Sequence, residues 1–138
     1  MRQKEFEKIG KTGCYFLSIV HVAEKYIGKY IDSYDAYKAA IRSKTMRDDC
    51  YVTDPSALLR MLTGVAWTVT KEPSDYATTK GEQEILYFER QDSATMATQT
   101  IGHFVVGDGM GVVSYDPYGD SLTVSKGVLS SKRIFRRA

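Results

Sequence analysis

Apolar side chains recur every three or four positions in the first half of the chain. Across residues 14–29 this spacing predicts a mostly buried helix that stops near Gly28. Capping residues at Asp32 and Ser33 predict a second helix over 32–42. A third helix is predicted over 54–64, where an aspartate is followed by a proline that suits the first helical position. We therefore expect the first half of the chain to be helical.

The second half alternates with the shorter period of strands. Runs rich in β-branched and aromatic residues, separated by polar or glycine-containing stretches, are typical of strands. Five such runs are present, at 65–70, 84–89, 103–106, 112–116 and 121–124. Helices followed by an antiparallel sheet make an α+β fold, and we expect one domain over residues 1–138.

The charge and hydropathy of the chain exclude several classes of protein. The 138 residues are 43% hydrophobic and carry a formal net charge of +2, which gives no argument for a nucleic-acid partner. The basic excess lies mostly at 132–137, which we interpret as a solvated end. The charged N-terminus lacks the apolar core of a signal peptide, and no run is long enough to span a membrane. These features predict a cytoplasmic protein with no membrane partner; the oligomeric state stays open.

The two cysteines have different settings. Because nothing indicates export to an oxidising compartment, we expect Cys14 and Cys50 to stay unpaired. No Cys-x-x-Cys pair is present, and His21 and His103 are far apart, so we expect neither a metal site nor a cofactor. Cys50 follows two aspartates whose charge disfavours a thiolate, and we assign it no catalysis.

Cys14 is placed where the first predicted helix begins. The positive end of a helix dipole and its free N–H groups favour the thiolate, which is the reactive form. Downstream, His103 heads a predicted strand and Asp116 ends the next. Nucleophile, base and orienting carboxylate therefore follow one another along the chain. Asp108 and Asp120 are alternatives for the carboxylate, but both fall in predicted turns.

The register of the predicted hairpin decides whether His103 meets Asp116. A two-residue turn at 109–110 sets them directly opposite, and a turn at 108–109 makes them diagonal neighbours on the same face. A three-residue loop breaks this parity unless a bulge restores it. The glycines at 107, 109 and 111 keep that outcome open.

These residues together resemble a known family. Gly-Cys-Tyr at a helix start, Gly-His-Phe-Val-Val in a strand and Tyr-Asp-Pro at a strand end are similar to papain-like cysteine peptidases, most of all the compact bacterial C39-type peptidases. The resemblance implies a papain-like fold, in which the first helix packs on a twisted antiparallel sheet. It implies that Cys14 is the nucleophile, His103 the general base and Asp116 the residue that orients the imidazole. The implied reaction is hydrolysis of an amide bond in a peptide or protein substrate.

The sequence departs from that family at the second oxyanion donor. Where these enzymes usually carry a glutamine about six positions before the cysteine, this chain has Lys8, and its only upstream glutamine is Gln3. Either side chain is a candidate donor, or the site is impaired. Two other functions therefore stay open: a catalytically silent domain that binds a partner protein, and a deamidase or transferase that uses the same thiol. Four tyrosines are candidates for lining the cleft, namely Tyr15, Tyr34, Tyr37 and Tyr118.

Overall fold

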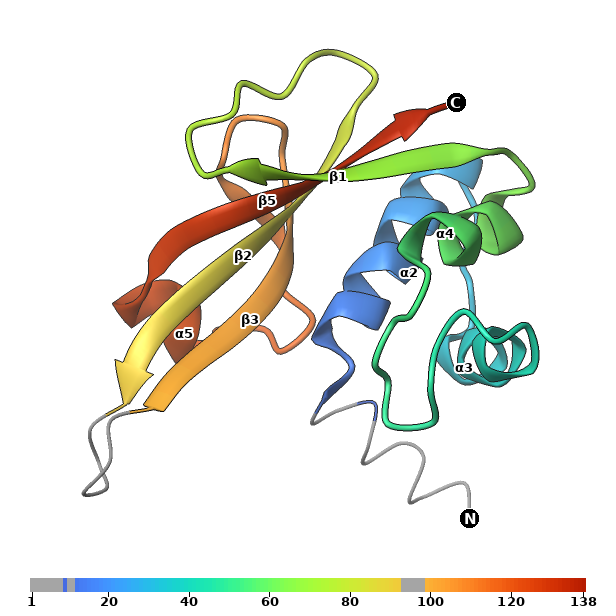
Figure 1. Cartoon of the computed structure of the whole chain (residues 1–138), viewed down its shortest axis with the longest axis horizontal. Coiled ribbons are helices and arrows are strands. Elements are labelled where there is room, and N and C mark those ends of the chain that lie inside the picture. The colour runs from blue at the N-terminus through green and yellow to red at the C-terminus, as the bar shows by residue number, and fades with distance from the viewer. Residues whose placement is uncertain (1–8, 10–11, 93–98) are drawn as a thin grey trace.

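A layer of helices packs against one sheet (Figure 1). The computed structural model describes residue 9, residues 12–92 and residues 99–138. Helix α2 spans Cys14–Ile27, α3 spans Ser33–Arg42 and α4 spans Pro55–Thr63. Asp32 caps α3 and Asp54 caps α4 with their carboxylates, and Gly28 ends α2 in a left-handed conformation with φ of 70°. The three predicted helices are thereby confirmed.

The sheet has five antiparallel strands. They are β1 (Trp67–Pro73), β2 (Gln83–Asp92), β3 (Gln99–Gly107), β4 (Val113–Tyr115) and β5 (Val128–Arg137), in the spatial order β1-β5-β2-β3-β4. The α+β class is therefore confirmed, with four of the five predicted strands near their expected places. His103 does not head its strand, because β3 begins four residues earlier.

Two predictions for the C-terminal part were wrong. Residues 121–124 do not form a strand: Ser121 accepts a hydrogen bond from the N–H of Val124 at 3.3 Å and so caps a short helix, α5 (Leu122–Lys126). Residues 132–137 are not a solvated end but lie in β5, between β1 and β2. The interior of β5 is buried in spite of its charge, since Ile134 and Phe135 are both fully covered.

The main core lies between α2 and the sheet. Phe16 and Ile19 of α2 are fully buried, as are Ile85 of β2 and Phe135 of β5. Helix α4 closes the core at one end through Leu58 and Leu59. Burial of these side chains fixes α2 against the sheet, and the start of α2 is thereby held beside β3.

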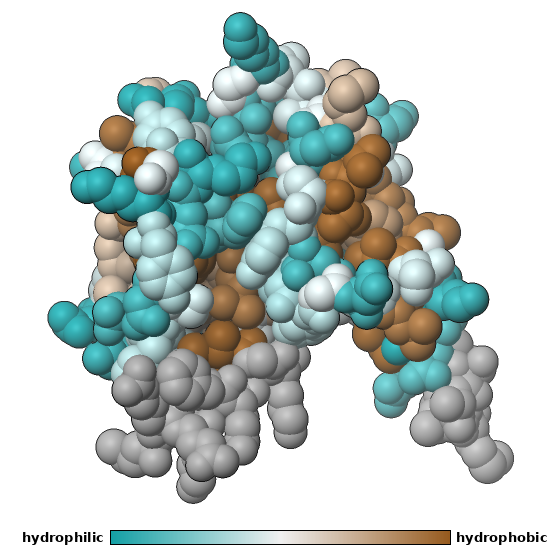
Figure 2. Space-filling model, turned by 180° about the vertical axis from the view of Figure 1, so that it is seen from behind, coloured by the Kyte–Doolittle hydropathy of each residue, from teal (hydrophilic) through white to brown (hydrophobic). Residues whose placement is uncertain are grey.

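Hydrophobic surface is unevenly distributed on the molecule. On the face opposite to that of Figure 1, it gathers over the half that carries the sheet, whereas the helical half is mostly hydrophilic (Figure 2). Among the residues that the structure describes, no helix combines the length and apolar character that a bilayer span requires.

Candidate active site

Helix α2 begins at Cys14 because of the residue before it. Gly13 donates its N–H to the carbonyl of Ile9 at 2.9 Å, and a Cβ at Gly13 would lie 2.4 Å from that oxygen. Only glycine tolerates this approach without a backbone shift. No side chain among the described residues caps this helix end, so its first N–H groups stay available to an anion.

The Cys14 thiol lies at an open edge of β3. Strand β4 pairs with β3 only at Val106 and Gly107, so it leaves the earlier residues of β3 uncovered at that edge. The start of α2 lies against this uncovered part of β3. The Phe104 N–H donates to the Cys14 thiol, and the Phe104 carbonyl accepts from Ser18 Oγ at 3.4 Å. The half-buried thiol is therefore fixed by both the helix and the strand.

His103 and Asp116 form a buried pair. The distance from His103 Nε2 to Asp116 Oδ1 is 2.7 Å, and the two side chains are only 3% and 7% exposed. Asp116 is itself held by the N–H of Tyr118 at 2.9 Å and by a hydrogen bond with Ser121. A carboxylate fixed in this way sets the orientation of the imidazole.

The other imidazole nitrogen is the one left for Cys14. His103 Nδ1 is buried and makes no fully formed hydrogen bond to a described residue, while the Cys14 thiol interacts with the imidazole strongly enough to change the pKa of both groups. Loose nucleophile–base contacts are usual before a substrate is bound. The three predicted side chains are thus brought together in the order Cys14, His103, Asp116.

The pKa shifts in this cluster favour charged forms. Burial alone would raise the pKa of Cys14, but the interaction with His103 and the N–H groups of Phe104 and Tyr15 bring it below its ordinary value. Burial would lower the pKa of His103, but Cys14 and Asp116 raise it overall. Burial would raise the pKa of Asp116, yet its hydrogen bonds lower it. A thiolate, an imidazolium and a carboxylate can therefore coexist.

The hairpin that joins His103 to Asp116 differs from both predicted registers. Val106 pairs with Tyr115 and Gly107 pairs with Val113, with a register shift between the two pairs. The loop of residues 108–112 has an odd length, and the bulge restores the parity that it breaks. Asp116 follows the last residue of β4 and reaches His103 as a diagonal neighbour.

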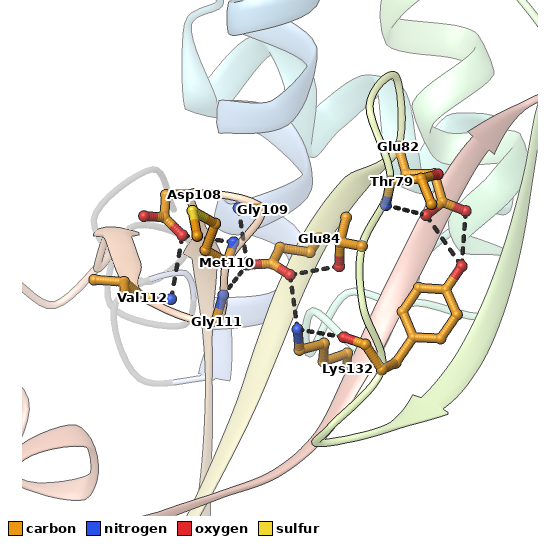
Figure 3. Close-up of polar contacts among 11 residues, drawn as sticks. Thr79, Glu82, Glu84, Asp108, Gly109, Met110, Gly111, Val112 and Lys132 are labelled. Carbon is orange, nitrogen blue, oxygen red and sulfur yellow. Dashed lines mark hydrogen bonds and ion pairs between the residues drawn. The ribbon is translucent and has the colours of Figure 1, made fainter.

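A buried carboxylate from β2 holds this loop (Figure 3). Glu84 Oε2 accepts from the N–H groups of Gly109 and Gly111, both at 2.9 Å. Its other oxygen accepts from Lys132 Nζ at 3.0 Å and from Thr78 Oγ1 at 2.6 Å. These partners bring the pKa of Glu84 below its ordinary value although burial would raise it. The loop conformation that places Asp116 thus depends on a charge outside the site.

The remaining predicted residues have other positions. Asp108 accepts from the N–H groups of Met110 and Val112 within the loop, and Asp120 is exposed, so neither replaces Asp116.

Gln3 and Lys8, the candidate oxyanion donors, lie outside the described residues. Tyr37 is buried in the core and donates to the carbonyl of Asp48 at 2.6 Å, so it does not line the site.

One family model covers residues 1–137, and its description is "Protein of unknown function, DUF261". The chain belongs to the DUF261 family. No curated protein and no solved structure matches it.

Tyr118, one of the four tyrosines expected to line the cleft, contacts both Cys14 and His103. Its ring stacks on His103 with centroids 4.6 Å apart, and its hydroxyl hydrogen-bonds with Cys14. Burial and the charge of Cys14 raise the pKa of Tyr118, so the phenol stays protonated and acts as a donor. Its signal in the sequence was an aromatic ring with a polar tip, whereas its stacking on His103 cannot be inferred from spacing.

Two cavities adjoin Cys14. One, of about 480 Å³, is lined by Tyr15, Phe104, Val52 and Arg133 among others, and also by Cys50. The other, of about 330 Å³, is lined by His103 and Tyr118. Within the described part of the chain, no group of three or more metal-ligating side chains is assembled. Cys14 therefore lines both cavities.

Proposed function

We propose that this member of the DUF261 family is a papain-like cysteine hydrolase that cleaves amide bonds of peptides or proteins. The observation that carries the proposal is the buried His103–Asp116 pair, 2.7 Å apart, whose imidazole keeps its second nitrogen for Cys14. The helix that starts at the nucleophile and packs on an antiparallel sheet supports the papain-like assignment.

The arrangement supports an acyl transfer in two stages. The Cys14 thiolate attacks the carbonyl carbon, a C–S bond forms, and one electron pair of the carbonyl moves to its oxygen. When the C–N bond breaks, the His103 imidazolium gives its proton to the leaving nitrogen. Water then attacks the thioester while His103 takes a proton from it, and the Cys14 thiolate leaves.

Two groups of this chain are suited to stabilise the oxyanion. The Cys14 backbone N–H is at the uncapped start of α2, and the Tyr118 hydroxyl is a protonated donor next to the thiol. In this proposal Tyr118 supplies the second oxyanion donor, which is usually a glutamine in papain-like and C39-type enzymes.

The test is the pH dependence of Cys14 alkylation by iodoacetamide, with the modified residue identified by mass spectrometry. We expect rapid reaction well below the ordinary pKa of a thiol, lost in His103→Ala and kept in Cys50→Ser. A Cys14 that titrates like a free thiol in both the wild type and His103→Ala would refute the proposal.

Products of a peptide library then separate hydrolysis from the deamidase alternative. Hydrolysis yields two shorter peptides, whereas deamidation leaves the peptide whole and exchanges one amide for an acid. An activated Cys14 with no turnover of any peptide would favour the alternative of a catalytically silent binding domain.

A further inference from the structure

The larger cavity beside Cys14 has a largely aromatic and apolar wall and, among the described residues, one cation without an ion pair. Tyr15 stacks on Phe104 with ring centroids 4.3 Å apart, and the Tyr87 ring lies 4.6 Å from that of Phe104. Arg133 of β5 completes the wall. Its guanidinium lies 5.3 Å from the Phe104 ring centroid and 5.7 Å from that of Tyr87. The aromatic faces hold the cation in place beside the cavity.

The charge of Arg133 is not neutralised within the described residues. No ion pair there involves Arg133, and its one hydrogen bond goes to Ser131 Oγ at 2.9 Å. Asp49, the acidic residue on the cavity wall, is instead paired with Arg47 through two hydrogen bonds. A guanidinium has five donors, so Arg133 keeps a fork that is suited to a carboxylate.

We propose that this cavity binds the part of the substrate next to the scissile bond, through an apolar group on the aromatic wall and a carboxylate on Arg133. This inference rests on the proposed function of Cys14 and specifies its substrate class. The carboxylate belongs either to an acidic side chain or to the end of a peptide chain. Both sources present the same planar pair of oxygens to the guanidinium.

Matched pairs of chloroacetyl compounds test the inference without a known substrate. Cys14 displaces chloride from the chloroacetyl carbon, which forms a C–S bond, and the rest of the compound extends into the cavity. Chloroacetyl-phenylalanine and its amide differ only in a terminal carboxylate. The amides of chloroacetyl-glutamate and chloroacetyl-glutamine differ only in a side-chain carboxylate. The ratio of alkylation rates within each pair measures the preference for an anion.

We expect the wild type to prefer the anionic member of at least one pair by about tenfold, as for a hydrogen bond to a charged group. The pair that shows the preference identifies the source of the carboxylate. Arg133→Gln should abolish the preference for the anion, and Arg133→Lys should keep part of this preference because the charge remains. The control, Arg60→Gln on the exposed surface of α4, should leave the preference unchanged.

The outcomes separate this inference from the proposed function. Equal rates within both pairs, or a preference that survives in Arg133→Gln, would overturn the carboxylate subsite while Cys14 stays reactive. Slow reaction of Cys14 with all four compounds would instead refute the nucleophile. In that case binding of acetyl-phenylalanine and its amide, followed through the Arg133 Nε–H signal by NMR, still decides the subsite.

Discussion

At the scale of single residues, the site depends on three groups that change one another's protonation. The thiolate exists above the lowered pKa of Cys14, and the imidazolium exists below the raised pKa of His103. Both shifts widen the pH range in which the charged pair is present. Asp116 supports the imidazolium from the far side of the ring, and its own pKa is lowered in return.

Asp116→Asn removes this negative charge while it keeps the size of the side chain. We expect the pKa of His103 to fall, because the imidazolium loses a charged partner. The midpoint of the curve of Cys14 alkylation rate against pH should then rise by about one unit. Iodoacetamide rates measured across the pH range would show the shift. Asp120→Asn, in the exposed part of the same turn, is the matched control. An unchanged profile would mean that Asp116 only shapes the turn.

Tyr118→Phe isolates one hydroxyl group. The ring that stacks on His103 is retained, and the donor to the Cys14 thiolate is lost. We expect the thiolate to be less stable, with a rise of about one unit in the midpoint of alkylation. Tyr30→Phe, which changes a side chain that is 81% exposed, should have no effect. A midpoint shared by Tyr118→Phe and the wild type would exclude the hydroxyl from the site.

At the scale of elements, the sequence predicted the strand that carries His103 and the strand that Asp116 follows, but not how the two strands are joined. Parity arguments gave two registers with two-residue turns and one three-residue loop that needed a bulge. The structure has a bulge, but its loop of residues 108–112 is longer than any of these. The choice depends on Glu84, whose carboxylate binds Gly109 and Gly111 from another strand. A contact across 25 residues leaves no mark on the local pattern from which turn types are inferred.

Glu84→Gln tests how far this carboxylate stabilises the hairpin. Glu84 is buried and paired with Lys132, so the neutral variant leaves a buried cation without its partner. We expect a loss of about 3 kcal/mol in the free energy of unfolding, measured by urea denaturation. Glu72→Gln on β1, where the carboxylate is partly exposed and its ion pair with Arg136 is long at 3.7 Å, should cost less than about 1 kcal/mol.

The free energy of unfolding, measured at several pH values, shows whether the charge of Glu84 is responsible for the stabilisation. Because the pKa of Glu84 is lowered in the folded state, its contribution is fully present above the unfolded pKa. The contribution is lost as the pH falls through the folded pKa. The difference between wild type and Glu84→Gln should therefore shrink in acid, and a difference that stays constant would assign the loss to packing alone.

At the scale of the whole molecule, β5 shows why the prediction for the C-terminal residues 132–137 was wrong. A strand with Lys132, Arg133 and Arg136 has the charge of a solvated tail, and its burial becomes evident only once its neighbours are known. Lys132 is neutralised by Glu84, and Arg133 lies on the aromatic wall of the cavity. Sequence patterns identified α2, α3 and α4 because these helices carry their own apolar period and local end signals, whereas β5 depends on partners distant in the chain.

Strand β5 lies between β1 and β2, so the sheet depends on its burial and pairing. Ile134→Ala, at a fully buried position, should lower the free energy of unfolding by about 3 kcal/mol. Val128→Ala in the same strand, where the side chain is 69% exposed, should cost less than about 0.5 kcal/mol. Deletion of residues 128–138 would leave β1 and β2 without their shared partner, and circular dichroism should then show an unfolded chain. A truncated chain that folds and keeps Cys14 reactive would show that the helices and the β2–β3 pair are sufficient for the site.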